Sequence, residues 1–332
     1  MALLHQRSSA TCLALLAVCS LSAVPASAQL YPLEIDHALG TTVLSEKPER
    51  IATVAWANHE VPLALGVVPV GFAAANFGDD NGNGLLPWVE TRLEELNATP
   101  PALFDEGDGI DFEAVAASQP DVILAAYSGL SQSDYATLSQ IAPVVAYPEG
   151  PWATDWRDMI QLNSQGMGMA EEGQALIEQL EAQIADTAAN HPDLAGKTAM
   201  FVTHLDPTNL GRISFYTDND ARVRFFHDLG LASPEVVKQN STPGKFAGAI
   251  SSELIDELND VDILVTYGGQ PLIEQLNAHP LTSRLPVVEK GAIVTLGNTP
   301  LGTAANPTPM SISWLLDDYA DLLSEAARKS QR

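Results

Sequence analysis

The spacing of apolar residues predicts one long helix near the middle of the chain. Over residues 171–190, apolar side chains recur at steps of one, three and four, which gathers them on one helical face. This stripe consists of Leu176, Ile177, Leu180, Ile184 and Ala188. The helix should end at His191-Pro192, because proline lacks the amide and clashes with the preceding turn. At 1.5 Å per residue such a helix is about 30 Å long.

A shorter helix is predicted just before it, over residues 155–165. Thr154 is its expected N-cap, since a threonine hydroxyl can accept a hydrogen bond from a free amide of the first turn. Gly166 and Gly168 should separate the two helices, because glycine is a poor residue for a helix interior.

Short apolar runs alternate with helical segments on both sides of this pair. Before it, strands are expected at 51–55, 67–72, 122–126 and 144–147, and helices at 60–65, 87–96, 110–118 and 133–140. After it, strands are expected at 199–203, 213–217, 263–267 and 292–296, and helices at 221–229, 252–258, 271–277 and 311–327. Such alternation is typical of parallel sheets covered by helices. We therefore predict an α/β fold of two Rossmann-like lobes with parallel-type sheets, joined by one long inter-lobe helix.

The N-terminus has the features of a secretory signal peptide. Arg7 precedes a short apolar run, Cys12 to Leu21, and Ala26-Ser27-Ala28 fits a cleavage site. The run is too short to span a bilayer. The predicted divisions are a signal peptide at 1–28, an N-terminal lobe at 29–152, a helical linker at 153–192 and a C-terminal lobe at 193–332. A buried N-terminal helix is the alternative for the first segment.

Charge and cysteine content narrow the function further. The formal net charge is −26, which argues against nucleic-acid binding through the bulk field of the protein. Both cysteines, Cys12 and Cys19, lie in the predicted signal, so a cleaved chain would form no disulfide and offer no thiolate to a metal. Cys19 lies inside the apolar run, which makes lipid anchoring the less favoured alternative to cleavage.

Several phrases resemble the substrate-binding proteins of iron–siderophore ABC importers. They are Lys47-Pro48-Glu49-Arg50-Ile51, the run from Ala64 to Gly71, the run from Asp111 to Ala125, and Pro280 to Val294. The resemblance implies a monomeric periplasmic protein that holds a ferric siderophore in the cleft between two lobes. It also implies delivery to a permease in the inner membrane, and it implies no cofactor and no catalysis.

The loops that follow the predicted strands are where ligand-binding residues are expected, because ligands of open parallel sheets sit beyond the carboxyl ends of the strands. The candidates are Trp56, Asn58, Phe77, Tyr127, Trp152, His204, Tyr216, Arg222, Arg224 and Tyr267. Aromatic faces suit a bulky chelate. Arg222 matches a position where the family often places an arginine against an anionic ligand, and its alternative is a surface ion pair with Asp218 or Asp220.

Two acidic residues match the positions through which family members dock to the permease, Asp134 and Glu274, although ordinary solvated carboxylates are the alternative. A separate loop fits the spacing of an EF-hand, with Asp79, Asn81, Asn83 and Glu90 as calcium ligands. Pro87 and the lack of a preceding helix favour a turn-rich loop there instead.

Other ligands and another class of protein remain open at this point. Haem would need an axial ligand, for which His59, His204 and Tyr127 are available, and cobalamin or a metal ion are further options for the same fold. The histidines show no H-x-H or H-x-x-x-H spacing. A secreted α/β enzyme is the reading from another class, and the sequence contains no G-x-S-x-G, Walker or G-x-G-x-x-G motif to support it.

Overall fold

The first lobe is built on a parallel sheet whose central strand is β3. A computed structural model describes residues 30–203 and 211–331, so the predicted signal peptide lies outside the described residues. Within them, the strand order of this sheet is β5-β4-β3-β6-β7. The strands are β3 (Ile51–Thr53), β4 (Gly71–Ala73), β5 (Ala102–Phe104), β6 (Val122–Leu124) and β7 (Val144–Val145), all parallel. The chain reverses its direction of winding between β3 and β6, which is the point where such sheets bind ligands.

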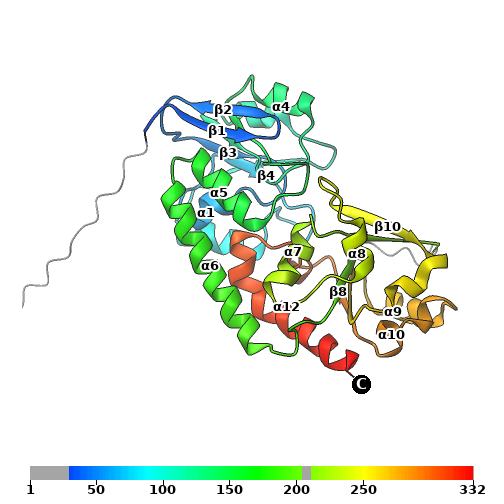
Figure 1. Ribbon diagram of the computed structural model, residues 1–332. Coiled ribbons are helices and arrows are strands. Elements are labelled where there is room, and N and C mark those ends of the chain that lie inside the picture. The colour runs from blue at the N-terminus through cyan, green and yellow to red at the C-terminus, as the bar shows by residue number, and fades with distance from the viewer. Residues whose placement is uncertain (1–29, 204–210, 332) are drawn as a thin grey trace, which may run out of the picture. The chain divides into compact units, whose positions relative to one another are not determined.

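Short helices and a hairpin complete the first lobe (Figure 1). The helices are α1 (Glu60–Ala64), α2 (Pro87–Glu95), α3 (Phe112–Ala117) and α4 (Gln132–Leu138). The hairpin of β1 (Leu33–His37) and β2 (Gly40–Leu44) was not expected from the sequence. It is attached to the sheet where the Thr42 hydroxyl donates to the carbonyl of Val144. The predicted strand at 67–72 begins only at Gly71, because residues 67–70 connect α1 to the sheet.

The second lobe contains a mixed sheet rather than a fully parallel one. Its order in the described chain is β10-β9-β8-β11-β12. The strands are β8 (Ala199–Val202), β9 (Arg212–Tyr216), β10 (Ala247–Ser251), β11 (Ile263–Tyr267) and β12 (Ile293–Leu296). β8, β11 and β12 run parallel, whereas β9 is antiparallel to both of its neighbours. The surrounding helices are α7 (Ala221–Asp228), α8 (Glu235–Asn240), η1 (Ser252–Leu258), α9 (Gln270–Ala278), η2 (Thr282–Arg284), α10 (Pro286–Glu289) and α11 (Pro300–Ala304).

The predicted long helix is α6 (Ala170–Asn190), preceded by α5 (Trp156–Gly166). Its buried residues include Ile177, Leu180 and Ile184, which confirms the predicted stripe. The N-cap of α5 is Asp155 rather than Thr154. The Thr154 hydroxyl instead donates to the carbonyl of Ala126, so the neighbouring carboxylate accepts the free amides of the helix.

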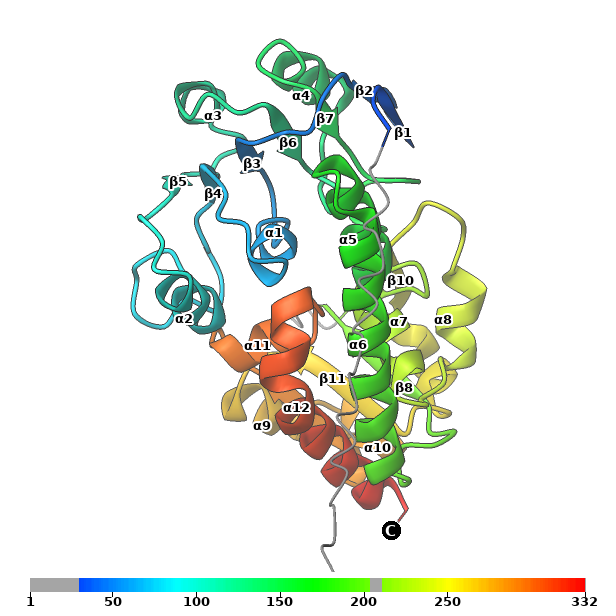
Figure 2. The same cartoon turned by 90° about the vertical axis from the view of Figure 1, so that its left-hand side faces the viewer.

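A second long helix, α12 (Pro309–Ser330), runs beside α6 (Figure 2). Three polar contacts join the two helices at intervals of one turn, and both members advance by four residues each time, so the helices are parallel. The pairs are Gln183 with Ser313 at 3.1 Å, Thr187 with Asp317 at 2.8 Å and His191 with Asp321 at 3.0 Å. α12 thus holds the C-terminal half of α6 against the second lobe.

The first turn of α12 also reaches the first lobe. The carboxylate of Glu60, on α1, accepts hydrogen bonds from the Met310 amide at 3.0 Å and from the Thr308 hydroxyl. It also accepts one from the Trp88 indole at 2.8 Å. The fold class of two α/β lobes is confirmed, and α12 adds a second connection to the one made by α6. None of the helices in the described segments combines the length and the hydropathy that a bilayer crossing requires.

Candidate ligand-binding site

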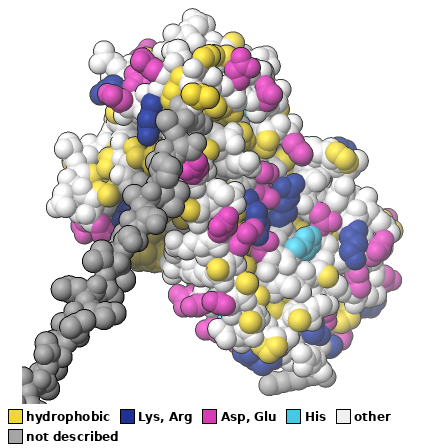
Figure 3. Space-filling view, turned by 60° about the vertical axis from the view of Figure 1, so that its left-hand side comes forward, with side chains coloured by type: hydrophobic (Ala, Val, Ile, Leu, Met, Phe, Trp, Pro, Cys, Tyr) yellow, Lys and Arg dark blue, Asp and Glu magenta, His cyan; other side chains and the backbone are white. Residues whose placement is uncertain are grey.

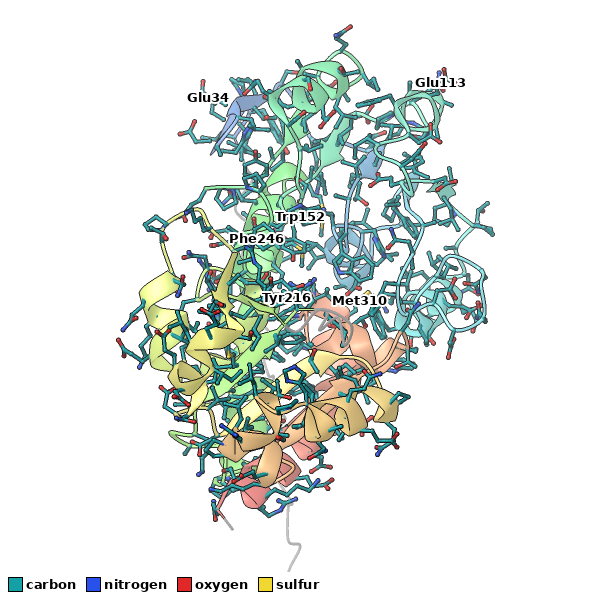
Figure 4. The ribbon with its side chains drawn as sticks, turned by 90° about the vertical axis from the view of Figure 1, so that its right-hand side faces the viewer. Glu34, Glu113, Trp152, Tyr216, Phe246 and Met310 are labelled. Carbon is teal, nitrogen blue, oxygen red and sulfur yellow. The ribbon has the colours of Figure 1, made fainter. Side chains whose placement is uncertain are left out.

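A cavity of about 340 Å³ lies between the two lobes. Most of its wall residues lie at or just beyond the carboxyl ends of strands in the two sheets, the place that the strand order predicts. Figure 4 shows Trp152 of the first lobe near Tyr216 and Phe246 of the second. The lining residues are Trp56, Asn76, Phe77, Tyr127, Trp152, Tyr216, Asp220, Arg222, Phe246, Tyr267, Thr303 and Asn306. We call this space the inter-lobe cavity.

Arg222 and Asp220 form an ion pair in the wall of the inter-lobe cavity. The Asp220 side chain is 1% exposed, and its two oxygens lie 3.0 and 2.9 Å from Nη1 of Arg222. Asp220 also caps α7 by accepting the Arg222 amide. Burial raises the pKa of Asp220, and the positive charge of Arg222 opposes that rise. The pair therefore places a positive charge in the cavity together with the negative charge that neutralises it.

Aromatic rings hold this pair and line the remaining wall. The Arg222 guanidinium lies 4.2 Å from the centre of the Tyr216 ring, in the cation–π range, and its Nε donates to the Tyr267 hydroxyl at 3.3 Å. Tyr267 meets Phe77 of the first lobe edge to face, with ring centres 5.5 Å apart. The two lobes thus contact each other directly at the cavity edge.

The opposite wall is formed by Tyr127 and Trp152, whose rings also pack edge to face, with centres 5.3 Å apart. Burial raises the pKa of Tyr127 to about 12, although Arg222 acts in the opposite direction. Its hydroxyl lies 3.4 Å from the amide oxygen of Asn306. Gly129 must be glycine here, because a Cβ would lie 2.3 Å from Nε1 of Trp152.

A second hollow, of about 420 Å³, continues into the first lobe. It shares Trp56, Asn76 and Trp152 with the inter-lobe cavity, and we call it the first-lobe hollow. Glu106 and Asp134 are the acidic residues in its wall. The main chain around the two spaces is strained, since three non-glycine residues adopt left-handed φ angles near 60°, a feature that clusters at functional sites. These are Ala55, Ala57 and Trp152.

Some polar atoms in the wall of the first-lobe hollow lack hydrogen-bond partners among the described residues. They include Nε1 of Trp56, Nδ1 of His59 and Oε1 of Glu106. The other Glu106 oxygen accepts the Ala55 amide at 2.9 Å, and burial raises the pKa of Glu106 to about 7. Burial lowers the pKa of His59 to about 3, so its ring is neutral at physiological pH. An unpaired donor and an unpaired acceptor thus lie in the same wall.

The structure gathers most of the candidates from the sequence around the inter-lobe cavity. Those that line it are Trp56, Phe77, Tyr127, Trp152, Tyr216, Arg222 and Tyr267. Two described candidates do not line it. Asn58 is fully buried and bonds the backbone of Val54 and Tyr127, whereas Arg224 contacts Asp155 and the carbonyl of Asp218. His204 lies outside the described residues.

Five lining residues were missed by the sequence reasoning. They are Asn76, Asp220, Phe246, Thr303 and Asn306. The rule that cleft residues follow strands applies to Thr303 and Asn306, which come after β12, and could have found them. Phe246 precedes the antiparallel strand β10, so that rule gives no signal for it.

The structure also shows where the candidate residues for permease docking and for calcium binding lie. Glu274 is exposed on α9, whereas Asp134 lies in the wall of the first-lobe hollow and forms a capping box with Ser131 on α4.

Asp79 accepts the amides of Asn81, Gly82 and Gly84, so its oxygens already have partners within the loop. Asn83 donates to Glu90. No group of three or more histidine, aspartate or glutamate side chains in the described ranges is placed to hold a metal ion.

Known proteins resemble this chain over most of its length. PiaA of Streptococcus pneumoniae TIGR4, solved in complex with ferrichrome, is 43% identical with a TM-score of 0.85, over 89% of this chain and 99% of that one. The probable siderophore-binding lipoprotein YfiY of Bacillus subtilis (strain 168) is 26% identical over 70% of this chain and 67% of its own. The Fe(3+) dicitrate-binding periplasmic protein FecB of Escherichia coli (strain K12) is 24% identical over 77% of this chain and 79% of its own length. Residues 51–300 match the family described as periplasmic binding protein. The family predicted from the sequence is thus confirmed: the chain belongs to the periplasmic binding proteins.

Proposed function

We propose that this protein captures a ferric siderophore in the inter-lobe cavity and delivers it to an ABC permease. The single observation that carries the proposal is that one cavity is lined from both lobes by aromatic rings and by an arginine whose side chain is 14% exposed. Both the cavity and the first-lobe hollow fall in the size range of small-molecule sites, about 300–1,000 Å³. The names of PiaA, YfiY and FecB support an iron chelate as the class of ligand.

The proposal includes a periplasmic monomer that performs no catalysis. The permease would lie in the inner membrane, and Asp134 and Glu274 remain our candidates for docking to it. Glu274 is exposed on α9 and can meet a partner as it stands. Removal of the N-terminal segment by cleavage is also part of the proposal, with a lipid anchor, as in the name of YfiY, as the alternative.

Haem is less well supported than a siderophore by the same residues. His59 is buried and stacks on Phe72 with ring centres 4.3 Å apart, and Tyr127 is engaged with Asn306. Either would have to move before it could bind an iron axially. The described residues therefore favour a chelate that brings its own iron ligands.

Quenching of tryptophan fluorescence tests the proposal, because Trp56 and Trp152 line the cavity. Ferric siderophores should quench and saturate at one per chain, whereas haem and cobalamin should not saturate at similar concentrations. Arg222→Ala should weaken binding by about 10- to 100-fold, the loss expected for a charge-assisted bond. Arg224→Ala is the matched control, since Arg224 lies on the same helix outside the cavity wall.

The result that would overturn the proposal is the absence of saturable binding by any ferric siderophore. Circular dichroism must accompany the Arg222 variant, because removing the arginine leaves Asp220 buried without its counter-charge. Equal losses in the two arginine variants would remove Arg222 from the site. Trp152→Ala offers a second test of the same wall that leaves the ion pair in place.

A further inference from the structure

The charges in the wall of the site are unusual for a protein that would bind an anion. Among the described residues that line the inter-lobe cavity and the first-lobe hollow, Arg222 is the only lysine or arginine. Residues 204–210, which the structure does not describe, include Asp206 and contain no lysine or arginine in the sequence. The acidic residues in the walls are Asp220, Glu106 and Asp134.

The one arginine already has its counter-ion. Both oxygens of Asp220 lie within 3.0 Å of Nη1 of Arg222, and Asp220 is 1% exposed. An anionic ligand that drew the guanidinium away would leave this carboxylate buried and unpaired, which is strongly unfavourable. An anion that left the pair intact would find little net attraction from it. It would also approach Asp134 and Glu106, of which Glu106 is only partly ionised near neutral pH. Like charges placed together in a binding site cost several kcal/mol.

The net charge of the whole chain also disfavours an anionic ligand. Its formal net charge is −26, so its long-range field slows the approach of anions rather than steering them inward. Acidic side chains are spread over the face of the molecule shown in Figure 3, with basic side chains among them. Neither the local nor the distant charges therefore favour a polyanion.

The polar side chains of the cavity wall suit a neutral polar ligand instead. The hydroxyl group of Tyr216, which lines the inter-lobe cavity, can both donate and accept a hydrogen bond. Amide groups carry both a donor and an acceptor, and the amide side chains of Asn76 and Asn306 add further hydrogen-bonding groups to the cavity wall. Ligand amides and hydroxyls could satisfy these groups without bringing any net charge.

We propose that the site selects ferric chelates that carry no net negative charge, and therefore trishydroxamates over triscatecholates and polycarboxylates. Three singly charged hydroxamates balance one ferric ion, whereas three doubly charged catecholates leave three negative charges. The inference rests on the proposed function, because it concerns which member of the siderophore class the same cavity accepts.

Titration of the wild-type protein with chelates of different charge tests the inference. Suitable probes are the neutral trishydroxamate ferrichrome, the cationic ferric complex of desferrioxamine B, the triscatecholate ferric enterobactin and ferric citrate. At least one trishydroxamate should bind about 100-fold more tightly than the triscatecholate or the citrate complex, which corresponds to the expected like-charge cost. Binding of the triscatecholate as tightly as any trishydroxamate would overturn the inference and leave the proposed function standing. Failure of all four chelates to bind would count against both.

Asp220→Asn separates the ion pair from shape as the source of selectivity. Asparagine keeps the size and the N-capping ability of aspartate, but it leaves the charge of Arg222 uncompensated. The ratio of trishydroxamate to triscatecholate affinity should fall by about 10-fold, through tighter binding of the anion. Asp218→Asn is the matched control, since it removes one charge two residues away without touching the lining, and its ratio should not change.

Should Asp220→Asn fail to fold, Glu106→Gln is compared with the wild type at about pH 8, where a carboxyl group with a pKa of about 7 is mostly ionised. It then removes a negative charge from the first-lobe hollow and should shift the ratio in the same direction. A ratio that stays at the wild-type value in a folded variant at either position would overturn the assignment of selectivity to these charges.

Discussion

Glu106 illustrates how a single side chain in the ligand-site wall responds to its surroundings. Burial raises its pKa to about 7 from an ordinary 4.5, the Ala55 amide opposes the rise, and the charge of Asp111 adds to it. The folded protein therefore holds this proton more tightly than the unfolded chain does. Its contribution to stability is fully present below about pH 4.5 and is lost as the pH rises through 7.

Glu106→Gln should remove this pH dependence, because the amide keeps the shape of the carboxyl group and does not ionise. The wild type should lose on the order of 2–4 kcal/mol of unfolding free energy from this group between about pH 5 and pH 8. Urea unfolding at the two pH values measures the difference. The free energy of unfolding of the variant, relative to that of the wild type, should be higher at pH 8 than at pH 5. The control is Glu113→Gln on the exposed face of α3. Parallel pH profiles for wild type and Glu106→Gln would contradict the prediction.

At this scale the sequence predicts which residues reach the cavity rim better than it predicts where their side chains point. Trp56 and Asn58 both follow β3, yet Trp56 lines the cavity and Asn58 turns inward to bond the backbone of Tyr127. Arg222 and Arg224 lie two positions apart on α7 and so project in different directions. Direction depends on backbone torsions such as the left-handed φ of Ala55 and Ala57, which nothing in the apolar pattern encodes.

At the scale of elements, burial on both faces decides how well a strand can be predicted. β11 runs over the predicted residues 263–267, since a central parallel strand is apolar at nearly every position. The hairpin of β1 and β2 buries only alternate residues, and β10 at the sheet edge is mostly exposed or half-buried, so their sequences gave a weaker pattern. α6 was predicted to within one residue because its stripe faces a single side.

Gly173 provides a test of the packing between α5 and α6. A Cβ at this position would lie 2.0 Å from Oγ and 2.5 Å from Cβ of Ser164, which is fully buried. Helix propensity alone predicts that Gly173→Ala stabilises the protein by about 1 kcal/mol. Overpacking of the contact costs about 1–3 kcal/mol or more, and we expect it to dominate, so that the variant is destabilised. Urea unfolding of the wild type and of Gly173→Ala measures whether the free energy of unfolding falls or rises.

A double-mutant cycle separates the contact from other effects. Ser164→Gly removes both clashing atoms at a helix-propensity cost of about 0.5 kcal/mol, and adding Gly173→Ala to it should then stabilise the protein. Gln174→Ala, on the exposed side of the same turn, controls for helix propensity. Additive effects in the cycle would show that the two helices do not touch at this point.

At the scale of the whole molecule, the lobes are held together at more places than the predicted linker. α6 and α12 both connect them, and the buried carboxylate of Glu60 joins α1 to the first turn of α12. A further contact lies next to the cavity-lining residue Phe77, where the Gly78 amide donates to the Asn298 side chain at 2.7 Å. The sequence pattern could suggest one linker from its apolar stripe, but contacts between distant loops leave no periodic signal. The relative position of the lobes should therefore depend on single residues at these contacts.

Gly78→Ala should disturb that position and weaken ligand binding. A Cβ here would lie 2.3 Å from Cγ2 of Thr303 across the lobe boundary, and the φ of +77° adds backbone strain. Gly82→Ala is the matched control, because Gly82 has a φ of +76° with no atom within 4 Å of the added Cβ. Both variants should lose about 1 kcal/mol through backbone strain. Only Gly78→Ala should also lower the affinity for a ferric trishydroxamate, on the order of 10-fold, because the clash forces apart two walls that bind the same ligand.

The source of that loss can be identified by removing the other partner of the clash. Thr303→Ser deletes Cγ2 but keeps the hydroxyl that donates to the carbonyl of Pro300. The double variant Gly78→Ala/Thr303→Ser should therefore recover most of the affinity while keeping the strain shared with Gly82→Ala. Calorimetric titration with ferrichrome compares the affinities of the wild type, Gly78→Ala, Gly82→Ala and the double variant. If Gly78→Ala bound as well as Gly82→Ala, the lobe boundary at this loop would not set the geometry of the site.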